Sequence, residues 1–156
     1  MTTHTAASRP GVALLDVSVL VALAWPNHVH HEVVRAWFRR NHRGGWATCS
    51  MTQTGFVRVS ANTAFIPTAV SPREAVLLLA ELTGLAGHRF WADDLQFVRS
   101  VHVDTDRLVG HRQVTDAHLL GLALRHSGRF ATLDGKLRSL LPDGVPASSI
   151  DVVRLK

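Results

Sequence analysis

Short apolar runs alternate along the chain with stretches in which apolar residues recur at helical spacing. Residues 12–15, 46–49 and 130–133 are almost wholly apolar, which is typical of strands buried on both faces of a parallel sheet. Residues 89–91 and 150–155 predict two further strands. The apolar pattern therefore predicts a set of short strands spread over the whole chain.

The segments between these strands carry signals for helix starts. Residues 71–74, Ser-Pro-Arg-Glu, match a capping box with proline at the first helical position, and they predict a helix to about residue 82. Residues 50–53 match a second capping box, and residues 17–25 predict a helix directly after the first strand. The other predicted N-caps are Asn27 and Thr115.

The order of these elements predicts the fold class. Strands alternate with helices, which indicates an α/β fold of three layers, α/β/α, around a mainly parallel central sheet. No repeat, low-complexity tract or linker interrupts residues 12–156, so we expect a single domain there. Residues 1–11 are mostly polar or small and are predicted to be a disordered lead-in.

Composition supports one folded unit in a reducing compartment. The chain has 156 residues, 46% of them apolar, which is enough for one substantial core. Its single cysteine, Cys49, excludes an intramolecular disulfide and a cysteine-rich zinc site. The apolar run over residues 12–25 is too short to span a bilayer and is interrupted by Asp16. We therefore expect a cytoplasmic protein without a membrane segment.

The charge of the chain suggests a class of partner. Lysine and arginine number 17 against 12 acidic residues, giving a net charge of +5, and most of the cations are arginine. Arginine binds phosphate through two parallel hydrogen bonds and stacks on bases, so a nucleic-acid partner is a fair hypothesis. An arginine-rich composition also results from a GC-rich genome, and charge alone leaves both explanations open.

Three carboxylates occupy equivalent places in the predicted fold. Asp16 and Asp134 directly follow predicted strands, and Asp116 follows the predicted cap of a helix. Ligands of open parallel sheets bind beyond the carboxyl ends of the strands, where these acids can meet. Clustered carboxylates repel one another unless a divalent cation neutralises them, which points to Mg²⁺ or Mn²⁺. Such an ion activates water against a phosphodiester, so the three acids predict nuclease chemistry.

Each acid also has a simpler explanation. Asp116 is a favourable charge in a first helical turn, and Asp134 with Gly135 is a common turn pair. Asp16 is harder to explain in this way, because an acid that ends an apolar run needs solvation, a cap or a partner. Asp16 is therefore the strongest of the three candidates.

Three motifs together resemble those of one known family. They are LLDVSVLVAL at residues 14–23, QVTDAHL at residues 113–119 and FATLD at residues 130–134. In order and spacing they are similar to the acidic motifs of PIN-domain ribonucleases, specifically the VapC-type toxins of type II toxin–antitoxin systems. The resemblance covers about residues 12–155.

The resemblance implies a function and a set of site residues. Asp16 and Asp116 match the principal metal ligands of the family, and Asp134 matches its distal acid. Ser18 and Thr132 match its hydroxyl positions near the metal. The implied protein is an Mg²⁺- or Mn²⁺-dependent endoribonuclease that cleaves a restricted set of structured RNAs, tRNA or rRNA. A small cognate antitoxin and a homodimer are implied as its partners.

One position departs from the family pattern. The family usually has a glutamate within a Ser-x-x-x-x-Glu arrangement, whereas Ser50 is followed five residues later by Gly55. A subgroup of these toxins resembles this segment, so the loss is not interpreted as inactivation. Asp93 or Asp94, after a predicted strand, is a candidate replacement, and a solvated turn pair is the alternative. A PIN-like module without catalysis, which binds RNA or protein, remains the alternative function.

Other features point to function less directly. Residues 28–32 contain three histidines and a glutamate, but a helix would not place all of them on one face, so a solvated helix start is favoured over a metal site. Residues 39–43 form a basic run that complements a helix dipole or contacts phosphate. The motifs of dinucleotide enzymes, P-loop nucleotide hydrolases and serine hydrolases are absent from the sequence.

Overall fold

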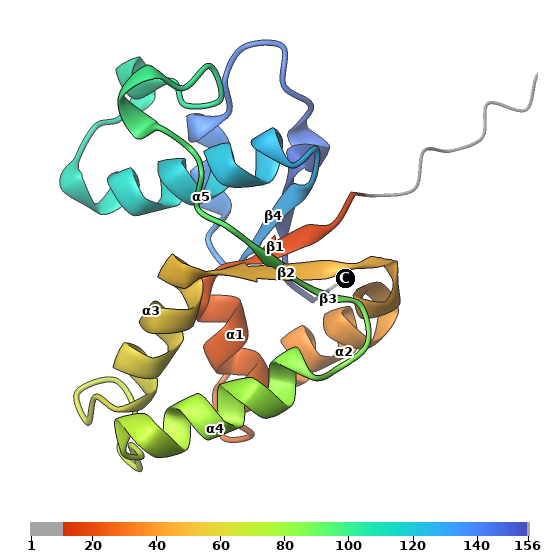
Figure 1. Ribbon diagram of the computed structural model, residues 1–156, viewed down its shortest axis with the longest axis vertical. Coiled ribbons are helices and arrows are strands. Elements are labelled where there is room, and N and C mark those ends of the chain that lie inside the picture. Colours follow the sequence, from red (N-terminus) through yellow and green to blue (C-terminus); the bar gives the residue numbers. More distant parts are fainter. Residues whose placement is uncertain (1–10, 156) are drawn as a thin grey trace, which may run out of the picture.

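A parallel sheet forms the centre of the protein. The computed structural model describes residues 11–155, and its five strands lie in the order β3-β2-β1-β4-β5 with every neighbouring pair parallel (Figure 1). The strands are β1 (Ala13–Leu15), β2 (Trp46–Cys49), β3 (His88–Trp91), β4 (Arg129–Thr132) and β5 (Ile150–Val152). Because all the strands run in one direction, their carboxyl ends share one edge of the sheet.

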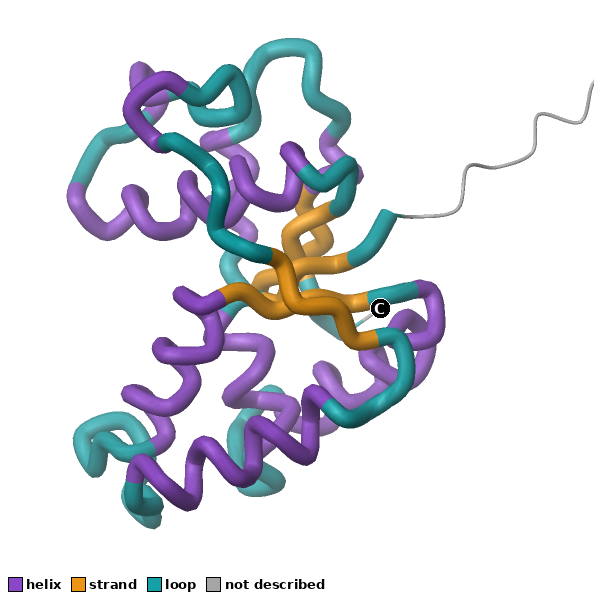
Figure 2. Tube along the Cα trace, in the orientation of Figure 1, coloured by secondary structure: helices purple, strands orange, loops and turns teal. Residues whose placement is uncertain are grey.

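Helices cover both faces of the sheet. The α-helices are α1 (Val17–Ala24), α2 (His31–Asn41), α3 (Ser50–Ser60), α4 (Pro72–Thr83) and α5 (Val114–Arg125). Helices α1 to α4 lie on one side of the strands and α5 lies on the other (Figure 1). A long connection with short 3-10 turns leads from β3 to α5 (Figure 2). The predicted three-layer α/β/α architecture is confirmed.

The core consists of two apolar clusters separated by the sheet. Side chains alternate between the faces of a strand, so Ala13 and Leu15 pack towards α1 while Leu14 packs towards α5. The same alternation places Trp46 in the first cluster and Phe130 in the second, both of them fully buried. Burial on both faces explains why the strand sequences are continuous apolar runs.

Several predicted boundaries are wrong by a few residues. Helix α2 begins at His31 rather than after Asn27, because residues 25–31 form two successive turns closed by backbone hydrogen bonds from His28 to Trp25 and from His31 to His28. Helix α5 begins at Val114, which puts Thr115 inside its first turn instead of at the cap.

Two further boundaries also differ from the prediction. The capping box of α3 is formed by Cys49 and Thr52, one position before the predicted box. The last strand ends at Val152 rather than at residue 155. The predicted box at Ser71 is confirmed, since its hydroxyl accepts a hydrogen bond from the amide of Glu74.

The predicted lead-in falls outside the described residues apart from Gly11. The carbonyl of Gly11 accepts a hydrogen bond from Nη1 of Arg129, so this residue is tied to the folded domain. None of the helices within residues 11–155 combines the length and the apolar character needed to cross a bilayer.

A polar network fastens the amino-terminal edge of the sheet. Arg129 is nearly buried, and its guanidinium donates to Asp151 at 3.3 Å and to Oδ1 of Asn41 at 3.0 Å. The indole of Trp37 donates to the same carboxylate oxygen of Asp151 at 2.9 Å. The network joins β4, β5 and α2 at the edge opposite to the carboxyl ends of the strands.

Candidate active site

Asp16 lies at the junction between β1 and α1, next to β4. Its amide donates to the carbonyl of Ala131 at 2.9 Å, which extends the strand pairing by one residue. As the N-cap of α1, it accepts hydrogen bonds on its carbonyl from Val19 and Leu20. The backbone thus fixes the start of α1 and holds the Asp16 side chain at the carboxyl edge of the sheet.

The Asp16 carboxylate is partly buried and is bound by hydroxyl groups. Its Oδ2 accepts a hydrogen bond from Oγ1 of Thr132 at 2.8 Å. Burial raises the pKa of Asp16, while hydrogen bonds from Thr132, the Val17 amide and the Ser18 hydroxyl oppose that rise. Both hydroxyl residues expected from the sequence, Ser18 and Thr132, are therefore brought to Asp16.

Asp134 lies beyond the end of β4 and begins a 3-10 turn (Gly135–Leu140). Its Oδ1 accepts a hydrogen bond from the amide of Lys136 at 2.9 Å, and its own amide donates to Oγ1 of Thr132 at 3.2 Å. The Thr132 hydroxyl consequently links the two acids, because it accepts from the backbone of Asp134 and donates to the side chain of Asp16.

Asp116 reaches the same region from the other face of the sheet. It lies in the first turn of α5 and is partly buried. The pKa of Asp116 rises to about 6, first through burial and then through the negative charges of Asp16 and Asp134. The negative charges of Asp16 and Asp134 therefore act on Asp116, although the three acids come from distant parts of the chain.

This donor set has the chemistry of a site for a hard cation. Within residues 11–155, no three histidine, cysteine or acidic side chains converge as a closed metal-binding cluster. Mg²⁺ does not need such a cluster, because it usually keeps several waters and binds proteins through one or two carboxylates. The carboxylates of Asp16 and Asp116, both partly buried and both with raised pKa, fit that requirement.

Gly55 is explained by the packing of α3 against α1. A Cβ atom on residue 55 would lie 2.6 Å from Cγ2 of Val17, well inside contact distance. The branched side chain of Val17, next to Asp16, therefore fills the space that a longer residue at position 55 would need. The structure thus supplies an apolar contact where the family pattern has a carboxylate.

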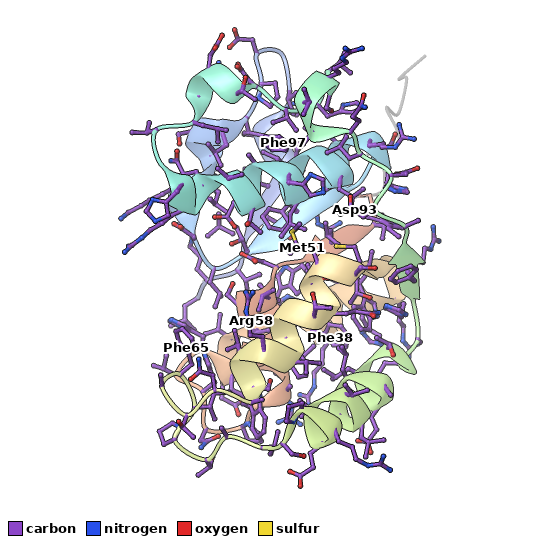
Figure 3. The ribbon with its side chains drawn as sticks, turned by 60° about the vertical axis from the view of Figure 1, so that its left-hand side comes forward. Phe38, Met51, Arg58, Phe65, Asp93 and Phe97 are labelled. Carbon is purple, nitrogen blue, oxygen red and sulfur yellow. The ribbon has the colours of Figure 1, made fainter. Side chains whose placement is uncertain are left out.

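The candidate replacements for that carboxylate lie elsewhere. Both oxygens of Asp94 bind the guanidinium of Arg125, at 2.9 and 3.0 Å, beside the last turn of α5. Asp116 is at the opposite end of that helix. Asp93, labelled in Figure 3 where the chain leaves β3, has its Oδ1 atom 2.8 Å from Nε2 of the nearly buried His118. Side chains of α5 hold both acids, and neither acid is among the charges that act on Asp16 or Asp116.

The histidines after α1 have structural contacts. The Nδ1 atom of His28 accepts a hydrogen bond from the amide of His30 at 3.1 Å, and Nδ1 of His31 lies 2.8 Å from the carbonyl of Ala22. These contacts close the turns that lead into α2. The sequence interpretation as a solvated helix start, rather than a metal site, agrees with this arrangement.

Comparison with known proteins decides the family. The family model of the PIN domain matches residues 13–140 of the chain. The chain belongs to the PIN domain family. The PIN-domain match includes β1 to β4, α5 and all three acids.

Named relatives place this PIN domain in the VapC group. It is 43% identical over 141 residues to ribonuclease VapC39 of Mycobacterium tuberculosis, covering 90% of this chain and 99% of the relative. It is 49% identical over 129 residues to ribonuclease VapC38 of the same species, covering 83% and 89%. The resemblance inferred from the three motifs is thereby confirmed.

A solved structure confirms the PIN fold. The crystal structure of Mycobacterium tuberculosis VapC20, described as a toxin that cleaves the sarcin-ricin loop, superposes with a TM-score of 0.55. The match covers 83% of this chain and 99% of the other, at 12% sequence identity. At that identity the likeness concerns the fold alone.

Proposed function

We propose that the protein is a metal-dependent endoribonuclease and the toxin of a toxin–antitoxin pair. Its relatives VapC38 and VapC39 are named ribonucleases, and both align with most of this chain. Its substrates would be a restricted set of structured RNAs, tRNA or rRNA, whose cleavage arrests translation in the cytoplasm. A small antitoxin would block the acids, and two copies of the chain would form the active dimer.

The observation that carries this proposal is the effect of Asp16 and Asp134 on the third acid, Asp116. The pKa of Asp116 rises to about 6 partly because Asp16 and Asp134 lie close enough to repel its charge. Repulsion between such carboxylates destabilises the folded protein, and a bound cation removes that repulsion and stabilises the fold. Bound Mg²⁺ or Mn²⁺ supplies a Lewis acid for the phosphate and lowers the pKa of a water molecule.

The residues of the chain would divide the remaining tasks. Asp16 and Asp116 would hold the cation, and Asp134 would add negative charge on the exposed side. Thr132 keeps Asp16 in one orientation through a 2.8 Å hydrogen bond, so that this carboxylate does not have to reorganise when substrate binds. Ser18 would support the same carboxylate from α1.

The decisive experiment is RNA cleavage by the purified protein. Total cellular RNA is incubated with Mn²⁺ or Mg²⁺, and the 5′ ends of the products are mapped. We expect a few discrete cuts that require metal and disappear in Asp16→Asn and Asp116→Asn. Asp94→Asn is the matched control: it changes charge in the same way, but its exposed carboxylate pairs with Arg125, so cleavage should persist.

Two other results would change this assignment. A protein that cleaves no RNA and whose melting temperature does not respond to metal would be a non-catalytic module. If Asp94→Asn instead loses cleavage and binds metal more weakly, Asp94 is a metal ligand that replaces the missing glutamate.

A further inference from the structure

The carboxyl edge of the sheet carries cations as well as acids. Arg154 follows β5 by two residues, and the backbone pairs Thr132 with Val152 and joins the amide of Val153 to the carbonyl of Thr132 at 2.8 Å. Two residues beyond Thr132 is Asp134, and two residues beyond Val152 is Arg154. The register of the last two strands therefore places Arg154 level with Asp134.

The side chain of Arg154 lies over the turn that Asp134 begins. A Cβ atom on Gly135 would lie 3.3 Å from Nη2 of Arg154, so the guanidinium occupies space that the glycine leaves open. Lys136, the next residue, donates its amide to Asp134 and is exposed. Two cationic residues thus lie at the turn that Asp134 begins: Lys136 within it and Arg154 against it.

These cations are available to a ligand. The ion pairs within residues 11–155 include neither Arg154 nor Lys136, although Asp134 is their neighbour. Both side chains are exposed at the surface. In contrast, Arg107, Arg125 and Arg129 are each bound to a carboxylate of the chain itself. A cation left unpaired beside carboxylates fits a ligand that brings its own negative charge.

We propose that Arg154, together with Lys136, binds a phosphate of the RNA backbone next to the phosphodiester that a cation held by the acids would bind. This inference rests on the proposed function. Arginine binds phosphate with two parallel hydrogen bonds, whereas lysine acts as a mobile point charge. Phosphate contacts fix the register of a nucleic acid without reading its bases. The pair would therefore position the strand over Asp16 and Asp116 and leave sequence choice to other surfaces.

The test is RNA binding measured apart from cleavage. A fluorescent single-stranded RNA of 12 nucleotides is titrated with protein in EDTA at several salt concentrations. Arg154→Ala should weaken binding about tenfold, the loss expected for one hydrogen bond to a charged group. The slope of log affinity against log salt should become shallower by about 0.7. Arg154→Lys should keep the salt slope and lose part of the affinity.

A matched control separates a local contact from general charge. Arg35 is exposed on α2, outside the basic run of residues 39–43, on the helix that leads through η1 (His42–Gly44) to the start of β2. Arg35→Ala removes the same charge and should leave the affinity and salt slope unchanged. Equal effects of Arg35→Ala and Arg154→Ala would overturn the proposal, and so would an unchanged affinity in Arg154→Ala.

The two proposals can fail separately. If the wild type binds RNA through Arg154 but never cleaves it, the nuclease assignment is wrong and the phosphate contact stands. If the wild type cleaves RNA and Arg154→Ala does so with unchanged KM, the phosphate contact is wrong. With both proposals correct, Arg154→Ala should raise KM with little change in kcat, because the lost contact exists before and during the reaction.

Discussion

Thr132 on β4 donates a 2.8 Å hydrogen bond to Oδ2 of Asp16, joining the carboxyl ends of two neighbouring strands. This bond favours the charged form of Asp16 and opposes the rise in pKa that burial causes. We predict that Thr132→Val lowers cleavage about 10- to 100-fold, the usual effect of removing a group that orients a metal ligand. The low-pH limb of the pH–rate profile should also move to higher pH.

Thr48 offers a matched control for this change. It is a fully buried threonine on β2 whose hydroxyl contacts His88 and Gln53 rather than the acids. Thr48→Val should leave the pH–rate profile in place. A Thr132→Val protein with a wild-type profile would show that the hydroxyl does not govern the charge of Asp16.

The raised pKa of Asp116 predicts how stability depends on pH. Its folded value is about 6, above the ordinary value of about 3.9, so the folded state binds this proton more tightly than the unfolded state. The resulting stabilisation is complete below about pH 4 and is lost as the pH rises through about 6. The pKa of Asp16 is raised as well and acts in the same direction.

The melting temperature of the metal-free protein is the measurement for this prediction. The melting temperature of the wild type minus that of Asp116→Asn should be smaller at pH 7 than at pH 5. Only the wild type carries the proton on residue 116 that is lost between these two pH values. Groups other than Asp116 are present in both proteins, so the difference isolates the effect of this carboxyl. A difference that is constant across this range would contradict the assigned pKa.

Metal should stabilise the folded protein at neutral pH. A ligand that binds only the native state at one hundred times its Kd adds about 2.7 kcal/mol to the free energy of unfolding. We expect Mn²⁺ to raise the melting temperature at pH 7 and less so at pH 5, where protons compete for Asp116. Calorimetry with Asp16→Asn should show no such rise, and a rise that survives this change would place the cation elsewhere.

The contact between Gly55 and Val17 predicts a coupling between two helices. Alanine in a helix interior normally stabilises relative to glycine by up to about 1 kcal/mol, but here its Cβ would lie 2.6 Å from Val17 Cγ2. Valine cannot turn away easily, because its χ1 is stiff. Gly55→Ala should therefore destabilise the wild type by about 1–3 kcal/mol.

A double-mutant cycle measures this coupling by urea unfolding. In the Val17→Ala background the obstructing methyl groups are gone, so Gly55→Ala should become neutral or stabilising. An identical effect of Gly55→Ala in both backgrounds would mean that the two residues are independent.

The Arg129 network predicts a loss of stability without a loss of chemistry. Arg129→Met leaves the Asp151 carboxylate with the Trp37 indole as its remaining hydrogen-bond donor, and we expect a loss of about 3 kcal/mol, the usual cost of breaking a largely buried ion pair. Metal affinity should persist, because the network lies at the other edge of the sheet. The control is Arg107→Met, whose more exposed pairs with Asp104 and Asp143 should be worth less than about 1 kcal/mol.

Local sequence signals were sufficient to predict the architecture and to pick out the acids. Asp16 and Asp134 end strands whose apolar character reflects burial on both faces, so their places follow from the chain alone. The start of α2 could not be found in this way, since its position depends on the turns around His28. Thr115 is equally misleading, because it has the residue type of a cap but lies within the helix.

Long-range contacts account for the features of the site that the sequence did not predict. The reason for glycine at position 55 is Val17, which belongs to another helix. The position of Arg154 beside Asp134 depends on the register of β5 against β4, which no spacing along the chain reveals. The pairing of Asp94 with Arg125 likewise holds this acid at the end of α5 opposite to Asp116, and the sequence shows only that an acid follows a strand.

Strand β4 has Arg129 as its first residue and Thr132 as its last. Three residues of extended chain separate them by about 10 Å, and β4 is paired with both β1 and β5 along this length. These pairings hold the register of the strand when Arg129 is replaced. Stability and catalysis can thus evolve separately at the two ends of one strand, at Arg129 and at Thr132.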